Sequence, residues 1–434
     1  MTIIIILVLG FMMGSVFMRA NTLLSETDTR IFSQQAFYAA EAGIEYAVYQ
    51  LRLDKDFDPS AMPNGLQNVP LLSDVNDSGS VIGTYSIQLD RNGEKVNDFD
   101  TVWVRSTGTS TGRGLIENKS GQAISRSIVT RVMLIDPTEF FISTLGNINF
   151  VGGASFDHSI LAKNIKFETN PSTPISIDGD VLYMQSITGY DHANPDATPQ
   201  ISIPSEKKVE QSPSITFTGL DLNFYRQLAQ EGGGYYASTL ELSGELTAEQ
   251  FNSTNGVIFA EGNITIEGEY KDDLVIVSAR DILFSGSLQE ANDEENPQIG
   301  LLAKDNVIIN GNAPPNLTID AFILADGGRF FANGNQYSKG NLDFYGAISV
   351  RGTSGSESGV NLSVYSTRDY EYNDQLSTNR RIPFLPRIAN IIEWYEGNPN
   401  DNFPPSCGNG RCEGGENFSG CPADCNAQTQ PNFR

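Results

Sequence analysis

The side chains best suited to chemistry lie together near the C-terminus. The chain has four cysteines, spaced C-x4-C-x8-C-x3-C at Cys407, Cys412, Cys421 and Cys425. Zinc sites usually contain C-x2-C pairs, so we predict two disulfides, for which three pairings are open. Oxygen-bearing side chains stand among them, at Asn409, Glu413, Glu416 and Asp424. Because Ca²⁺ takes carboxylate and carbonyl oxygens from loops, a calcium site at these four residues is a hypothesis, with a solvated acidic turn as the alternative.

Catalysis has few other candidates. They are two histidines and two pairs of aspartates: His158, His192, Asp178/Asp180 and Asp272/Asp273. Neither histidine stands in a hydrolase or metalloprotease motif. Both aspartate pairs fall where turns are expected, and aspartate is a common turn residue. We therefore predict no catalytic residue and no enzyme, and keep a polysaccharide-active enzyme as a minor alternative.

Charge limits the partners. Lys and Arg number 28 against 53 Asp and Glu, which gives a net charge of -25 and a pI near 4.4. Binding a phosphate backbone needs clustered cations, so we predict no nucleic-acid partner. The cysteines are confined to the tail and the body has none, which indicates an exported, oxidising setting.

The first 52 residues predict one long helix. Residues 1–18 carry no charge. An uncharged apolar stretch of this length is close to what is needed to span a bilayer. Apolar residues then recur every three or four positions up to Leu51, and proline first appears at Pro59. We expect a continuous helix of about 50 residues, roughly 75 Å long. Its apolar part predicts a membrane segment that also packs a shared helical core, and a single-span tethered surface protein is the alternative.

Two β-rich regions follow. Alternating residues at 83–90, 101–110 and 123–135 predict antiparallel strands packed on the helix, in a small head over 53–140. Over 141–396, short apolar runs recur between Gly, Asn and Asp, linked by AEGNI, ARDI and AKDNV. This period favours a parallel β-helix with inserted loops over a β-sandwich. A short helix is expected in 221–236, capped by Asp221 and stopped by Gly232.

The predicted fold class is therefore α+β and mainly β. A long N-terminal helix is followed by a small antiparallel head and a β-solenoid. Residues 397–434 form a linker and a disulfide-stapled module.

Residues 30–51, RIFSQQAFYAAEAGIEYAVYQL, closely resemble the helix of PilX-like type IV pilins. Residues 246–396, with TRDYEYNDQL, IPFLP and EWYE, resemble a domain found C-terminal to such helices, and the tail resembles small acidic cysteine modules of surface proteins, some of which bind calcium. Most pilins have Glu at the fifth mature position, where Ile5 stands here. An apolar residue leaves the helix register to side-chain packing.

The resemblance implies a structural subunit, major or minor, of an extracellular type IV pilus-like filament. It implies self-association, a pilus assembly machinery, and the cytoplasmic membrane as anchor before assembly. The implied filament-core residues are Met1, Thr2, Ile5, Leu9, Gly10, Gly14, Phe17, Leu24, Phe37, Tyr38, Ala40, Glu41 and Gly43. A pilus-tip or tethered adhesin is the alternative, and it predicts an exposed aromatic patch around Phe330, Phe331 and Tyr337.

Overall fold

The computed structural model describes residues 2–397 apart from 73–80, 92–94, 97–98, 111–122, 152–153, 169–173, 192–193, 195–196, 213–214, 216–218, 292–295, 336–337, 352–358, 379–381 and 386. For residues 2–17, 20–21, 24–25, 63–64, 72, 82, 151, 154 and 378 it describes the backbone alone. The chain divides into two compact units. The first comprises Met1–Leu134 and Ala389–Arg434, and the second comprises Ile135–Ile388. The second unit is therefore inserted into the first.

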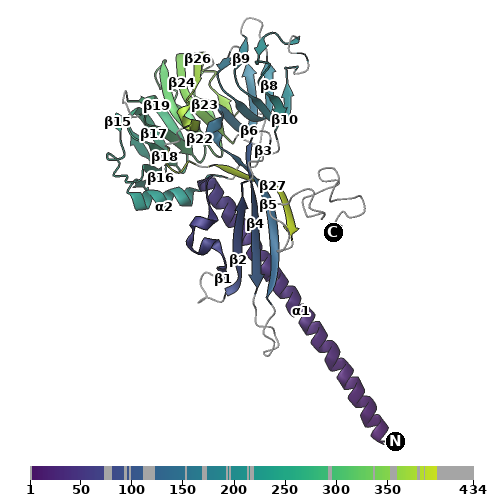
Figure 1. Cartoon of the computed structure of the whole chain (residues 1–434). Coiled ribbons are helices and arrows are strands. Elements are labelled where there is room, and N and C mark those ends of the chain that lie inside the picture. Colours follow the sequence, from purple (N-terminus) through teal and green to yellow (C-terminus); the bar gives the residue numbers. More distant parts are fainter. Residues whose placement is uncertain are drawn as a thin grey trace. The chain divides into compact units, whose positions relative to one another are not determined.

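The first unit begins with the predicted long helix. Helix α1 (Thr2–Leu53) has 52 residues and is followed by two 3-10 turns, η1 (Pro59–Ala61) and η2 (Pro63–Leu66) (Figure 1). Asp58 caps η1, because its carboxylate accepts a hydrogen bond from the Ser60 amide at 2.8 Å. Proline occupies the first position of η1, which is where helices accept it. η1 therefore begins as a separate segment after α1 has ended at Leu53.

An antiparallel sheet completes the first unit. Its strands are β1 (Val69–Leu72), β2 (Val81–Asp90), β3 (Lys95–Val96), β4 (Phe99–Ser110), β5 (Ile124–Ile135) and β27 (Ile388–Gly397). Their order is β1-β2-β4-β5-β27, with β3 paired to β4. The three predicted strands are confirmed as β2, β4 and β5. The predicted solenoid range 141–396 is corrected at its end, because β27 joins the sheet of the first unit. Its partner β5 lies far away in the sequence, and a local pattern gives no signal for such a pairing.

Helix α1 packs on one face of the sheet, with small side chains at the closest approach and Ile44, Val48 and Leu51 buried farther along. Ala36, Ala40 and Ala47 are fully buried on it. A Cβ added at Gly108 of β4 would lie 1.9 Å from the carbonyl oxygen of Ala36, and one at Gly43 would lie 2.1 Å from the Ser106 hydroxyl. The backbones of α1 and β4 therefore approach more closely than larger side chains allow. Ala36 and the following Ala-Ala-Glu-Ala-Gly motif, residues 39–43, supply the helix side of this contact.

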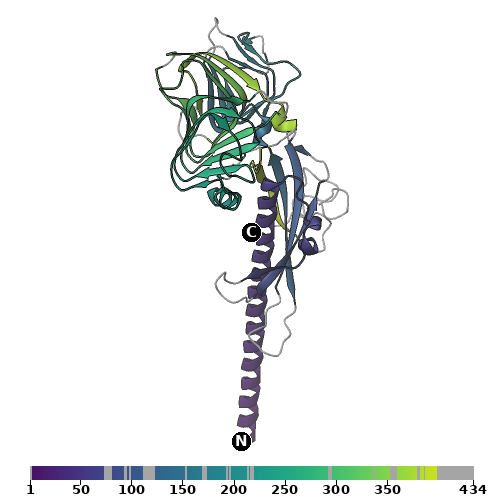
Figure 2. The ribbon, with the colours of Figure 1, turned by 90° about the vertical axis from the view of Figure 1, so that its left-hand side faces the viewer.

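The second unit is a parallel β-solenoid of about eight turns, which confirms the predicted solenoid over the sandwich (Figure 2). Its elements are η3 (Pro137–Glu139), β6 (Ile142–Val151), β7 (Ala154–Phe156), β8 (Ile160–Glu168), β9 (Ile175–Ile177), β10 (Val181–Thr188), β11 (Ile201–Ser202), β12 (Val209–Gln211), α2 (Leu222–Gly232), β13 (Tyr235–Tyr236), β14 (Leu240–Leu242), β15 (Glu245–Leu246), β16 (Val257–Ala260), β17 (Ile264–Tyr270), β18 (Leu274–Ser278), β19 (Ile282–Glu290), β20 (Ile299–Ala303), β21 (Val307–Ile309), β22 (Leu317–Ala325), β23 (Phe330–Ala332), β24 (Lys339–Val350), β25 (Val360–Asn361), β26 (Tyr365–Tyr372) and α3 (Gln375–Thr378).

The turns of the solenoid do not follow the order of the sequence. The early strands β6, β8 and β10 pair in succession, and so do the later strands β16, β18, β20, β22 and β24. β24 then pairs in parallel with β6, so the last turns stack on the first (Figure 1). The chain therefore enters the solenoid in the middle of the stack.

One row of aliphatic side chains crosses this junction without a break. Each member is the register partner of the next: Ile258, Ile276, Leu301, Ile323, Ile348, Ile142, Ile160, Val181 and Val209. All of them are buried. Beside the row, the hydroxyls of Ser143 and Ser349 lie 3.0 Å apart in a buried hydrogen bond. The two halves thus share one continuous core.

The repeated link between strands has a structural role. Asn263, Asp281 and Asn306 stand at its Asn/Asp position. The Asn263 side chain accepts a hydrogen bond from the Asp281 amide at 3.3 Å, and Asp281 accepts one from the Asn306 amide at 2.9 Å. Each corner side chain therefore binds the backbone of the next turn, which fixes the stacking of the corners.

The short helix predicted within 221–236 is α2. The Asp221 carboxylate caps its start by accepting from the Asn223 and Phe224 amides at 3.0 and 3.1 Å. Its C-cap is Gly233, in the left-handed region with φ 95°, one residue after the predicted Gly232. α2 lies against β13 and β16 and so covers strands of the later half.

The α1–β4 contact predicts the effect of a single methyl group. Gly108→Ala should lower the free energy of unfolding of the first unit by roughly 1–3 kcal/mol, because the nearest atoms are backbone and cannot move away cheaply. Gly311→Ala is the control, since its added Cβ meets other atoms only at 3.6 and 3.8 Å. Both tryptophans lie in the first unit, so fluorescence-detected urea unfolding reports on it. Equal midpoints for Gly108→Ala and the wild type would contradict the contact.

The junction of the solenoid predicts energetic coupling between distant residues. Ile142→Ala and Ile348→Ala should each destabilise the second unit by about 2–5 kcal/mol. Because the two side chains are register partners, the double variant should depart from additivity by about 0.5–3 kcal/mol. The pair Ile142→Ala and Ile276→Ala, which are not neighbours in the row, should be additive. Additivity for both pairs in circular-dichroism unfolding would argue against the junction.

Candidate functional site

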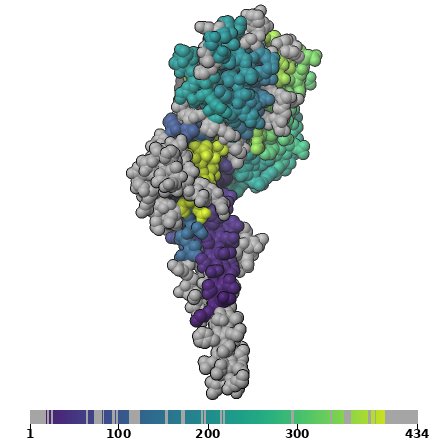
Figure 3. Space-filling model, turned by 90° about the vertical axis from the view of Figure 1, so that its right-hand side faces the viewer, coloured from purple at the N-terminus to yellow at the C-terminus, as the bar shows by residue number. Residues whose placement is uncertain are grey.

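Helix α1 has two opposite faces where it packs on the sheet, from about Ala36 onward. Nearer Leu23, the described side chains of Thr22, Glu26 and Thr27 are exposed as well. Leu23, Ile31 and Tyr38 are spaced by eight and seven residues, close to two helical turns, and so lie on one side. This side is opposite the buried alanines. Leu23 is 63% exposed and Tyr38 57% exposed. We call these three residues the outer stripe; Figure 3 shows part of α1 uncovered, in purple.

The structure divides the predicted filament-core residues. Tyr38 and Glu41 are exposed on α1, whereas Ala40 and Gly43 are buried against the sheet of the same chain. Phe37 is half-buried, with its ring 6.3 Å from that of Trp394 on β27. Ala40 and Gly43 therefore make contacts within the subunit.

The other predicted helix residues have no described side chains. Met1 lies outside the described residues, and so do the side chains of Thr2, Ile5, Leu9, Phe17 and Leu24, whose backbone is helical along with that of Gly10 and Gly14. Among the residues that the structure describes, no helix combines the length and apolar character that crossing a membrane requires.

The candidate catalytic aspartates serve as turn residues. Asp272 accepts a hydrogen bond from the Ala248 amide at 2.7 Å, and Asp273 accepts one from the Gln298 amide at 3.0 Å. Asp180 accepts from the Lys208 amide at 2.8 Å. The backbone amide of Asp178 donates a hydrogen bond to the Phe156 carbonyl. The carboxylates of Asp180, Asp272 and Asp273 bind backbone amides, which supports the turn interpretation for these three residues.

The described histidine is a packed side chain. The His158 ring stacks on Tyr372 with centroids 3.8 Å apart. Burial lowers the pKa of His158, with the nearby carboxylates of Asp374 and Asp157 acting in the opposite direction. His192 lies outside the described residues. Within the described residues, no group of His, Cys, Asp and Glu is arranged to hold a metal ion.

The sequence patterns did not single out a buried carboxylate in the solenoid. Asp320 lies in the middle of β22 and is hydrogen-bonded to the Tyr270 hydroxyl. Burial raises the pKa of Asp320 to about 6. Burial, with a smaller effect of Asp320, also raises the pKa of Tyr270. A charged residue inside the apolar run LTIDAFILA was the available signal.

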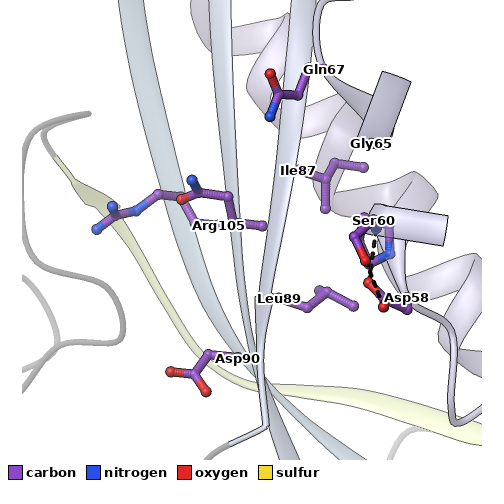
Figure 4. A pocket seen from close by; sticks show the side chains of 10 residues that line it. Asp58, Ser60, Gly65, Gln67, Ile87, Leu89, Asp90 and Arg105 are labelled. Carbon is purple, nitrogen blue, oxygen red and sulfur yellow. Dashed lines mark hydrogen bonds between the residues drawn. The ribbon is translucent and has the colours of Figure 1, made fainter. Parts of the chain in front are cut away.

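A cavity of about 650 Å³ lies at β2, but its lining groups do not converge. Asp90 and Arg105 lie on one side of the strand, whereas Ile87, Leu89 and Asp58 lie on the other (Figure 4). Hydrogen bonds from Ser60 lower the pKa of Asp58, which is the cap of η1. The arrangement offers no shared point at which a substrate could meet these groups.

The aromatic patch expected for an adhesin is not assembled as predicted. Phe330 is fully buried in the solenoid core, because β23 alternates between inward and outward positions. Phe331 points the other way and is half-buried, with the Arg329 guanidinium 4.9 Å from its ring centre. Tyr337 lies outside the described residues. The prediction of an exposed Phe330 is therefore wrong.

The predicted C-terminal sites lie outside the described residues. They are the cysteines Cys407, Cys412, Cys421 and Cys425 and the calcium candidates Asn409, Glu413, Glu416 and Asp424.

Comparison with models of known protein families, with curated proteins and with solved structures finds no match for this chain.

The buried Asp320 predicts a pH dependence of stability. Its pKa is higher in the folded protein than in the unfolded chain, so between about pH 4 and pH 6 the unfolded chain loses this proton first. The free energy of unfolding of the second unit should therefore fall as pH rises through this window, by roughly 3 kcal/mol from this group. Asp320→Asn, which keeps an acceptor for Tyr270, should remove that fall.

Asp343→Asn, at an exposed position on β24, is the matched control. Urea unfolding followed by circular dichroism at pH 4, 5, 6 and 7 makes the comparison. The same slope with pH in Asp320→Asn and in the wild type would disprove this role for Asp320.

Proposed function

We propose that this chain is a structural subunit of a type IV pilus-like extracellular filament. The observation that carries this proposal is the outer stripe of α1. Small residues dock one side of the helix on its own sheet, while large apolar side chains on the other side face solvent. A helix of 52 residues with such a surface is suited to packing against the helices of other copies.

The energetics favour this use. Burying one large apolar side chain contributes about 1.5–3 kcal/mol, so the outer stripe supplies several kcal/mol to each contact between copies. A contact between two different surfaces of identical subunits repeats without closing when the rotation between them does not close a ring. Repetition of one such helix contact therefore builds a filament.

The remaining parts of the chain fit the same proposal. Before assembly, the apolar residues 2–17 hold the subunit in the cytoplasmic membrane, and a pilus assembly machinery extracts it. In the filament the antiparallel head packs on α1 and the inserted solenoid is displayed outside the cell. The high negative charge keeps the displayed units soluble.

The outer stripe predicts a selective loss of filaments. Leu23→Glu and Tyr38→Glu should each reduce filament yield about tenfold or more, because each puts a charge into the apolar contact. Val81→Glu is the matched control, since Val81 is an exposed apolar residue of β2 in the same unit. Filaments are sheared from cells, counted by electron microscopy and assigned by mass spectrometry.

Subunit abundance before shearing is measured by immunoblot, so that a folding defect is recognised. Normal filament yield from Leu23→Glu and Tyr38→Glu at normal abundance would refute the proposed role of the stripe.

A further inference from the structure

A cavity of about 400 Å³ lies where α1 leaves the antiparallel sheet of the first unit. It is formed by α1, by the first residues of β5 and by the last residues of β27. Figure 3 shows α1 in purple and β27 in yellow on this face. The cavity has a size typical of small-molecule sites, which measure about 300–1,000 Å³. Its polar lining residues are Thr29, Ser33, Ser125, Arg126 and Glu396.

The polar groups of the cavity offer both hydrogen-bond donors and acceptors. The Arg126 guanidinium donates to the Ser33 hydroxyl through Nε at 2.9 Å and to the Glu396 carboxylate through Nη1 at 3.0 Å. The side chains of Arg126 and Glu396 both stay exposed, so they also reach solvent. Because the carboxylate of Glu396 balances the charge of Arg126, this pair presents hydrogen-bonding groups without a net charge.

An exposed indole adjoins these polar groups. Trp394 stands two residues before Glu396 on β27, so the two side chains lie on the same face of the strand. Phe37 stands one helical turn after Ser33 on α1, and its ring meets that of Trp394 edge to face, with centres 6.3 Å apart and planes at 76°. Trp394 nevertheless remains 51% exposed. The contact with Phe37 therefore holds the indole beside the cavity and leaves half of its surface for a ligand.

We propose that this cavity binds a neutral glycan built of pyranose rings, with Trp394 as the stacking platform. A pyranose with equatorial hydroxyls, such as glucose or N-acetylglucosamine, has apolar faces of axial C–H groups that pack on an indole. Its hydroxyls accept hydrogen bonds from Arg126 and donate them to Glu396. Acidic sugars are disfavoured, because the Arg126–Glu396 pair is neutral and the chain carries a net charge of -25. The inference goes beyond the proposed filament and does not depend on it.

Saturation-transfer NMR on the sugar protons tests this site in the full chain. The protein is kept in a zwitterionic detergent, because a detergent with a sugar headgroup would compete for the cavity. Cellotriose and chitotriose are the neutral probes, each titrated to millimolar concentration, and trigalacturonate is the acidic probe. We expect saturable binding of at least one neutral probe, with the strongest transfer to its axial ring protons, and weaker binding of trigalacturonate.

Two variants separate the stacking from the hydrogen bonding. Trp394→Ala and Arg126→Met should each weaken binding of the neutral probe about tenfold or more, with an unchanged circular-dichroism spectrum. Phe384→Ala, at an exposed aromatic of the second unit, is the matched control and should keep the wild-type affinity.

Three results would overturn the proposal. The first is that the wild type binds neither neutral probe, or binds trigalacturonate more tightly. The second is wild-type affinity in Trp394→Ala or in Arg126→Met. The third is self-association of the chain that Trp394→Ala abolishes and the neutral probes do not inhibit, which would assign the cavity to a second copy.

Discussion

The close contact between α1 and β4 is the constraint on which the head depends. Gly108 leaves room for the backbone of Ala36, and Gly43 leaves room for Ser106. Because β4 comes this close to α1 at Ala36 and Gly43, with Ile44 and Leu51 buried farther along the same side, the rotation of α1 about its axis is fixed. That rotation places Leu23, Ile31 and Tyr38 outward. One short motif thus determines which surface of the helix is free to meet other molecules.

The solenoid is inserted between two strands that are neighbours in the sheet of the first unit. β5 leads into the second unit and β27 leads back, and both are neighbours in the sheet of the first unit. Inside the solenoid, β24 stacks on β6, so the chain enters and closes the stack at one junction. The corner side chains bind the backbone of the next turn. Each turn therefore needs only its neighbours, whatever their order in the sequence.

Local patterns predicted the elements that depend on local chemistry. The long helix, three strands of the head, the solenoid and the cap at Asp221 all follow from periodicity and turn residues. The pairing of β24 with β6 could not be predicted, because the apolar runs specify that turns stack but not which turns meet. β27 was missed for the same reason. The inward side of Ala40 and Gly43 was also missed, since a stripe of small residues fits a contact within a chain as well as one between chains.

Side-chain footprinting tests the central claim, that one face of α1 is used within the subunit and the opposite face between subunits. Leu23 and Tyr38 of the outer stripe are exposed in the single subunit and react with hydroxyl radicals. Their oxidation, read by mass spectrometry, is compared between detergent-dispersed subunits and sheared filaments. We expect strong protection of both residues in filaments, with Val81 of β2 unchanged. Equal oxidation of Leu23 and Tyr38 in the two samples would contradict this use of the two faces.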